Sequence, residues 1–280
     1  AHPHIGTFKL VKVVENLREK IAALGGEVRF DQQVTDVLLK SEHGTQSMCG
    51  LRLRNTGDGS EIEVRATHVI MALGHSARDT FAMLHDRGIA MQAKAFSVGF
   101  RIEHPQSVID RARWGRHAGH PMLGAADYKL VHHAANGRSV YSFCMCPGGT
   151  VVAATSESGR VVTNGMSQYS RNERNANAGI VVGIDPSDYP FDEASFVNAF
   201  GESAGQRYAR EALALRAHDP SAAHPLSGIV LQRTLESGAF ALGGGTYEAP
   251  GQLVGDFLAA RPSVGLGSVA PSYRPGVTLG

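Results

Sequence analysis

Several features that mark specialised proteins are missing from this 280-residue sequence. No apolar run approaches the ~20 residues that a membrane-spanning helix needs, so we expect no membrane partner. The net charge is only +1, from 27 Lys and Arg against 26 Asp and Glu, which gives no support for a nucleic-acid partner. Cysteine is also scarce. The three residues Cys49, Cys144 and Cys146 argue against a secreted disulfide framework and indicate a cytoplasmic protein.

A credible phosphate-binding glycine fingerprint is missing as well. Residues 265–270 (Gly-Leu-Gly-Ser-Val-Ala) imitate one. Pro271 follows immediately, however, so no helix can present its N-terminus to a phosphate there. We interpret this run as a chance match.

What is present predicts a globular protein with a ligand crevice. The chain is 42% hydrophobic and 19% charged, enough to bury a sizeable core. Residues 67–75 form a short apolar run that stops on Ala72-Leu73-Gly74, and a helix-like stretch follows at 76–87. Fully buried parallel strands end in this way beside ligands, because glycine lets the backbone approach closely. We therefore predict a buried parallel strand at 68–73, in a nucleotide-binding protein whose first strand lies outside this chain.

The first ninety residues read as one helix, a meander of strands, the buried strand and a second helix. Apolar residues with 4-3-4-3 spacing predict a helix over 7–24 with Thr7 as its cap. They are Leu10, Val14, Leu17, Ile21 and Leu24. Strands are expected at 27–30 and 34–39, and a hairpin over 51–64 turns at Thr56-Gly57-Asp58-Gly59. This order matches the later part of a large dinucleotide-binding fold.

The pattern changes after residue 93. Strands are expected at 95–104, 128–133, 138–146, 150–155 and 180–184, and helices at 105–114, 191–216, 225–242 and 250–260. A polar stretch at 156–178 and the last twenty residues should be irregular. We predict two domains, residues 1–93 and residues 94–280, the second being mixed β-rich and helical.

Four longer motifs carry a family resemblance. They are residues 2–7 (His-Pro-His-Ile-Gly-Thr), 72–81 (Ala-Leu-Gly-His-Ser-Ala-Arg-Asp-Thr-Phe), 96–105 (Phe-Ser-Val-Gly-Phe-Arg-Ile-Glu-His-Pro) and 144–154 (Cys-Met-Cys-Pro-Gly-Gly-Thr-Val-Val-Ala-Ala). Over residues 1 to about 275 the chain resembles the bacterial FAD-dependent dehydrogenases of the NAD(P)/FAD-dependent oxidoreductase superfamily.

The resemblance implies an α/β fold and a flavin-based activity. The fold would be part of a three-layer FAD/NAD(P)-binding domain, a parallel sheet with an antiparallel meander, followed by a substrate domain. The full-length enzyme would transfer hydride through FAD to or from an unknown small-molecule substrate, with NAD(P)H as a candidate electron donor. Full-length members also carry an N-terminal pyrophosphate-binding turn that this sequence lacks. We therefore expect this central piece alone to bind FAD weakly or not at all, and to be inactive.

The strongest candidate cofactor-binding residues are Ala72, Leu73, Gly74 and His75, which the resemblance places beside FAD. The alternative is a structural strand-to-helix turn. Val34 stands where similar folds present backbone groups to the adenine edge, and its alternative is a core valine.

Two further candidates are turns with glycine. His4, Gly6 and Thr7 precede the first helix, whose free N–H groups suit an anion or a flavin edge, although a plain helix cap has the same pattern. Gly148 and Gly149 form a hairpin tip that can admit a flat ring, or an ordinary turn.

Three other interpretations receive less weight. Cys144 and Cys146 would lie on one strand face near the upper distance limit for a disulfide, so buried thiols are favoured over a redox pair. His132-His133 and His117 with His120 lack further ligands at zinc spacing, and we predict no metal site. Finally, the alternative to an enzyme is a non-catalytic folded module.

Two further points concern the assembly and the chemistry. A homodimer is an expected assembly, and the sequence identifies no general acid or base.

Overall fold

The computed structural model of the protein describes residues 4–279. Its helices are α1 (Thr7–Ala23), α2 (Arg78–Asp86), α3 (Gln106–Trp114), α4 (Glu193–Phe200), α5 (Glu202–His218), α6 (Ser227–Leu242) and α7 (Val254–Leu258). Its strands are β1 (Gln32–Glu42), β2 (Thr45–Asn55), β3 (Glu61–Arg65), β4 (Phe96–Pro105), β5 (Val131–His133), β6 (Ser139–Cys146), β7 (Gly149–Ala153), β8 (Thr163–Ser167), β9 (Asn175–Ile184), β10 (Ala249–Gly251) and β11 (Val277–Leu279).

Strands β1, β2 and β3 form an antiparallel sheet, which confirms the predicted meander. The β2–β3 turn is closed by Asn55, whose side-chain oxygen accepts the N–H of Gly57. A β-bulge interrupts β1 between Val34 and Asp36. Asp36 is buried and bonds to Arg87 just after α2, with Arg87 Nε 2.6 Å from Asp36 Oδ1. The Arg87 guanidinium holds the pKa of Asp36 below its usual range, so this pair ties α2 to the meander.

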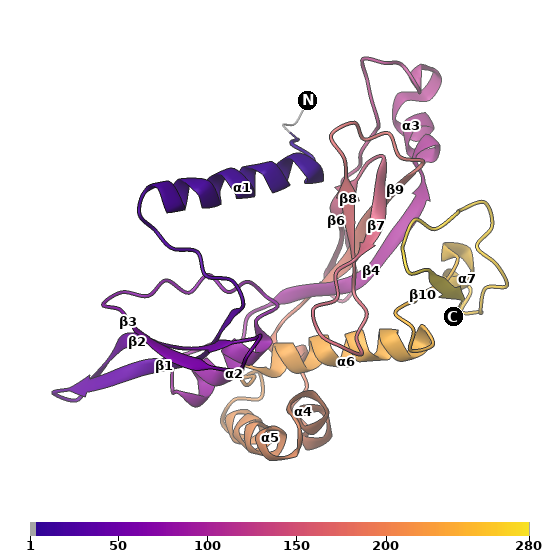
Figure 1. Ribbon diagram of the computed structural model, residues 1–280. Coiled ribbons are helices and arrows are strands. Elements are labelled where there is room, and N and C mark those ends of the chain that lie inside the picture. The colour runs from indigo at the N-terminus through magenta and orange to yellow at the C-terminus, as the bar shows by residue number, and fades with distance from the viewer. Residues whose placement is uncertain (1–3, 280) are drawn as a thin grey trace.

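A second antiparallel sheet has the strand order β4-β9-β6-β5, and β7 pairs with β8 in a separate hairpin (Figure 1). β4 and β9 pair over their full lengths, from Phe96 opposite Ile184 to Pro105 opposite Asn175. The predicted polar loop at 156–178 is therefore wrong in part, because it contains β8 and the first residues of β9. Asn175 and Asn177 are buried strand residues whose side chains bond to Glu103 and Arg101.

The apolar core lies among the helices. It consists of Phe196, Tyr208, Ala209, Ala212, Leu226 and Val230. The predicted helix over 191–216 is two helices, because Gly201 breaks it with a φ of 80°. Gly205 then lets α5 cross close to α4, since a Cβ there would lie 2.5 Å from the Cα of Val197. Phe81 and Ala82 of α2 pack against this core.

The predicted parallel strand at 68–73 is wrong. Residues 68–74 have no regular secondary structure in the described chain, and the Ile70 side chain is 92% exposed. An apolar run becomes a strand only when neighbouring strands pair with its backbone, and none lies beside it among residues 4–279. Within that range, parallel pairing occurs between β10 and β11 alone, so the predicted parallel sheet is absent there.

Two features near the N-terminus also differ from expectation. Residues 27–30 do not form a strand, and Val28 and Phe30 are exposed. The helix α1 is confirmed, but its apolar stripe is uncovered, with Leu17 at 59% and Leu24 at 75% exposure. In Figure 1 this helix stands apart from the three-stranded sheet. The helix pattern was therefore readable from the sequence, although the described chain provides nothing that buries it.

Candidate functional site

Five of the predicted cofactor residues meet where α1 begins. His4 Nε2 donates to the carbonyl of Gln168 at 3.1 Å, and Thr7 Oγ1 lies 3.4 Å from the carbonyl of Ser167. Ser167 is also the strand partner of Gly149. We call His4, Gly6, Thr7, Gly148 and Gly149 the N-terminal group. Residues 2 and 3 of the first motif lie outside the described residues.

Gly6 and Gly148 of this group allow close packing against other backbone segments of the chain. Gly6 is the N-cap of α1, with φ 79°, and a Cβ there would lie 2.5 Å from the backbone nitrogen of Tyr169. The predicted Thr7 cap is wrong, because Thr7 is the first helical residue and no side chain caps the helix. Gly148 has φ 46°, and a Cβ there would lie 1.8 Å from the carbonyl oxygen of Arg171. The hairpin tip is therefore already occupied by backbone on that side.

The side chain of Gln106 supports the same hairpin tip from inside. Its Oε1 accepts the N–H of Gly148 at 2.7 Å, and its Nε2 donates to Asp110 and to the carbonyl of Ala126. Gln106 is buried, so these bonds form without competition from water. The position of the turn is fixed by this network.

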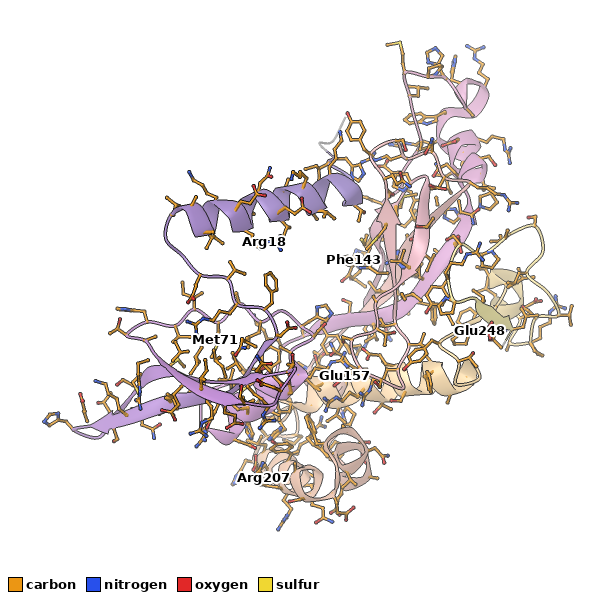
Figure 2. All side chains as sticks on the ribbon, viewed as in Figure 1. Arg18, Met71, Phe143, Glu157, Arg207 and Glu248 are labelled. Carbon is orange, nitrogen blue, oxygen red and sulfur yellow. The ribbon has the colours of Figure 1, made fainter. Side chains whose placement is uncertain are left out.

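The remaining predicted residues form a second group beside α2. Ala72, Leu73, Gly74 and His75 line an open pocket of about 450 Å³ together with Met71, Phe81 and Leu84. Val34 lies in β1, next to Gln33, whose side chain donates to Asp79 of α2 at 2.7 Å. We call Val34 and residues 72–75 the pocket group. Figure 2 shows Met71 at the end of the molecule that carries β1, β2 and β3.

The backbone of the pocket group is available to a ligand. Within the described chain, residues 68–75 form no backbone–backbone hydrogen bond. Gly74 has φ 68°, and a Cβ placed on it would meet nothing within 4 Å. The positive φ favours glycine at this position. No atom of the described chain, however, packs close to the Cα of Gly74. These features fit a ligand that is recognised through backbone groups.

The two groups lie on different elements. The N-terminal group lies at the start of α1 and in the β7–β8 hairpin, whereas the pocket group lies in β1 and in the segment before α2. The sequence motifs are therefore not brought to one point, but to two separate places. Two separate places suit an elongated ligand better than a compact one.

The two cysteines of the fourth motif differ in environment. A β-bulge between Phe143 and Cys146 removes the predicted common face, so Cys144 is exposed while Cys146 is buried. Burial, together with the neighbouring Cys144 thiol, raises the pKa of Cys146 to about 11. Thiol redox chemistry needs the thiolate, and Cys146 is a protonated thiol at neutral pH.

A buried ion network fixes the helix that borders the pocket. Arg78, at the start of α2, is 2% exposed and pairs with Glu157 at 2.7 Å and with Glu236 of α6 at 2.6 Å. Glu157 lies beside α6 (Figure 2) and also pairs with Arg160 and Arg233. The network joins the pocket group to the helical core.

Comparison with known proteins identifies the family. The chain matches the family described as "FAD-dependent protein, C-terminal domain-like" over residues 95–214 and 193–280. It belongs to this family of FAD-dependent proteins. A Clostridium beijerinckii (strain ATCC 51743 / NCIMB 8052) protein, described only as uncharacterized, is 43% identical over 274 residues, which are 98% of this chain and 44% of that relative. The chain thus spans less than half the length of this relative. Among its described helices, none has both the length and the apolar character to cross a membrane.

One cluster had no signal in the sequence. His85, Glu211 and His224 meet although 139 positions separate the two histidines. Their spacing follows no ligand motif, and only the packing of α2, α5 and the connection before α6 brings them together.

Proposed function

We propose that this chain forms one side of the FAD site of an oxidoreductase that transfers hydride to or from a small-molecule substrate. The observation that supports this most is the pocket group, where an unpaired backbone segment and a glycine with open space line a pocket in a chain of a FAD-dependent family. When bound, FAD would supply the redox chemistry. Ala72, Leu73, Gly74 and His75 would hold the cofactor through backbone groups.

Each of the two groups would bind a different part of the elongated cofactor. The pocket group, including Val34, would bind the adenine half, and the N-terminal group would position the flavin edge. His4 and the first turn of α1 offer N–H groups and a positive helix end at that place. We propose NAD(P)H as the electron donor of this reaction.

Replacing Gly74 with alanine should weaken FAD binding at least tenfold in the full natural protein. The new methyl group would stand between the exposed backbone and the cofactor, while no protein atom lies within 4 Å of it. Gly88→Ala is the matched control, because Gly88 has φ 73° and equally open surroundings at the end of α2. Both variants should lose about 1–2 kcal/mol of stability from the positive φ. Titration followed by flavin fluorescence, with thermal unfolding alongside, separates the two effects.

Equal FAD affinity in the two variants would contradict the assignment of Gly74. If the natural protein itself shows no flavin absorbance even after FAD is added, the oxidoreductase proposal fails. The second candidate, a non-catalytic binding module, would then be favoured. The exposed apolar stripe of α1 is the observation that supports that candidate.

A further inference from the structure

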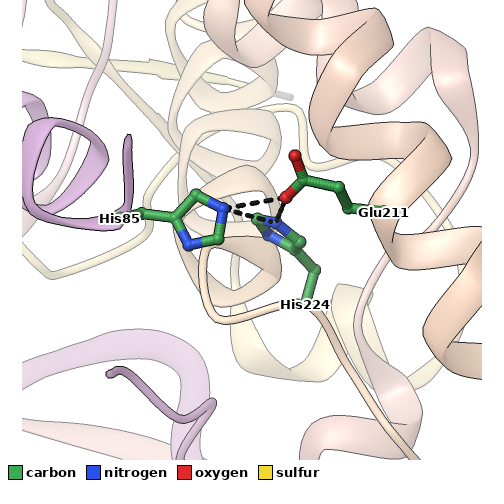
Figure 3. A group of neighbouring side chains, drawn as sticks. All are labelled: His85, Glu211 and His224. Atoms are coloured by element: carbon green, nitrogen blue, oxygen red, sulfur yellow. Dashed lines mark hydrogen bonds and ion pairs between the residues drawn. The ribbon is translucent and has the colours of Figure 1, made fainter. Parts of the chain in front are cut away.

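Three side chains from separate elements meet at the edge of the helical core. His85 comes from α2, Glu211 from α5, and His224 from the connection that leads to α6 (Figure 3). Glu211 Oε2 is 2.8 Å from His85 Nε2 and 2.9 Å from His224 Nε2, and the two nitrogens are 3.2 Å apart. The His224 side chain is 1% exposed, whereas Glu211 is 41% exposed and opens the cluster to solvent.

Hydrogen bonding alone accounts poorly for this arrangement. The three distances are nearly equal, so the two imidazole nitrogens approach one carboxylate oxygen at an acute angle. Two N–H groups that donate to that oxygen would then lie against each other. A cation among the three atoms removes this conflict, because it accepts a lone pair from each. Ligand atoms about 2.1 Å from a metal are about 3.0 Å apart at right angles and about 3.4 Å apart at the tetrahedral angle that zinc prefers, so the three side chains need to open by only a few tenths of an ångström.

We propose that His85, Glu211 and His224 bind a divalent transition-metal ion, with zinc as the probe of choice. Two imidazoles and one carboxylate suit zinc and its neighbours, and do not suit calcium or magnesium, which prefer all-oxygen sites. The cluster borders a hollow of about 440 Å³ that is also lined by His218. Three protein ligands leave coordination positions open toward this hollow, for water, a small ligand or the His218 ring.

A hydrogen bond to His224 determines which ring proton must move when a metal binds. The N–H of Leu226 points to Nδ1 of His224 at 3.2 Å, so the neutral ring carries its proton on Nε2 when no metal is bound. Metal binding at Nε2 moves that proton to Nδ1 and gives up this one long hydrogen bond.

The ion would connect α2 with the helical core. Tyr208 and Phe196 pack against the His224 ring, and His85 stacks edge-on against the same ring. Because these contacts hold two of the three ligands in place, the site is preorganised. Metal binding should therefore raise the melting temperature of the folded protein.

Calorimetric titration of the metal-stripped protein with Zn²⁺ tests the proposal, and Co²⁺ absorption reports the ligands. We expect one equivalent to bind and to raise the melting temperature. Glu211→Gln and His85→Asn should each weaken binding at least tenfold and remove the thermal shift. These two ligands are partly exposed, so both variants should remain folded. His132→Ala is the matched control, since His132 is an exposed histidine on β5, and its titration should equal that of the wild type.

Several outcomes would overturn the proposal. They are the absence of binding in the wild type, equal affinity in Glu211→Gln, and a thiolate-to-cobalt charge-transfer band, which would place the ion at a cysteine instead. Circular dichroism of each variant verifies folding. Flavin binding is not involved in this experiment, so its result is independent of the oxidoreductase proposal.

Discussion

Replacing Arg78 with methionine should destabilise the protein by about 3–5 kcal/mol. The guanidinium is buried between Glu157 and Glu236, and both carboxylates are themselves largely buried. Removal of the positive charge leaves Glu236 without its partner and takes one of three arginines from Glu157. Loss of one member of a buried ion pair is costly because the remaining charge keeps its desolvation penalty. Equilibrium unfolding in urea measures the change.

Arg54→Met is the matched control. Arg54 pairs with Glu61 at 2.7 Å in the meander, but both side chains are exposed, and the expected loss is below about 1 kcal/mol. The double variant Arg78→Met with Glu236→Gln should recover part of the loss, because it removes the carboxylate left alone. Similar losses in Arg78→Met and Arg54→Met would show that the buried network does not hold α2 to the core.

The same network predicts a specific response to acid. Burial alone would raise the pKa of Glu157, but hydrogen bonds from Arg233 and Arg78 outweigh it and lower the pKa to about 2. A carboxylate with a lowered folded-state pKa contributes stability above its unfolded value of about 4.3, and this contribution is lost as the pH falls toward 2. The unfolding free energy should therefore fall between about pH 5 and pH 2, and fall less in Glu157→Gln. A pH-independent difference between wild type and Glu157→Gln would contradict the lowered pKa.

Local patterns in the sequence predicted the elements whose partners are close along the chain. The 4-3-4-3 spacing from Leu10 to Leu24 identified α1, and alternation around Gly57 identified the β2–β3 hairpin. Propensity and period decide such elements because their hydrogen bonds are local. The same reasoning failed for residues 68–73. An apolar run there carries the composition of a buried strand, yet strand formation depends on neighbouring backbone that no local pattern contains.

The candidate site was predicted as residues rather than as geometry. The motifs singled out Gly6, Gly74 and Gly148, and the structure shows that each has a positive φ. The sequence could not show that Gly6 and Gly148 face the chain's own backbone while Gly74 faces open space. It also could not reveal His85, Glu211 and His224, because their meeting depends entirely on helix packing.

Replacing Gly148 with alanine should cost about 2–5 kcal/mol of stability. The positive φ accounts for about 1–2 kcal/mol. Overlap of the new methyl group with the carbonyl of Arg171 adds about 1–3 kcal/mol, because backbone on both sides cannot move freely. Gly137→Ala is the control. Gly137 has φ 82° in the β5–β6 turn and nothing within 4 Å, so only the first cost applies. Urea unfolding of both variants gives the difference.

This comparison also decides between the two interpretations of the Pro147-Gly148-Gly149 turn. If the glycine serves packing, FAD affinity of the Gly148→Ala molecules that remain folded should equal that of the wild type, and stability alone should fall. If the turn admits the flavin ring, the variant should be nearly as stable as Gly137→Ala but lose FAD. The contact of Gly148 with Arg171 and the support from Gln106 favour the first result. Under that result, the flavin edge would be positioned by His4 and the first turn of α1, and the hairpin would act only by holding Ser167 against Thr7.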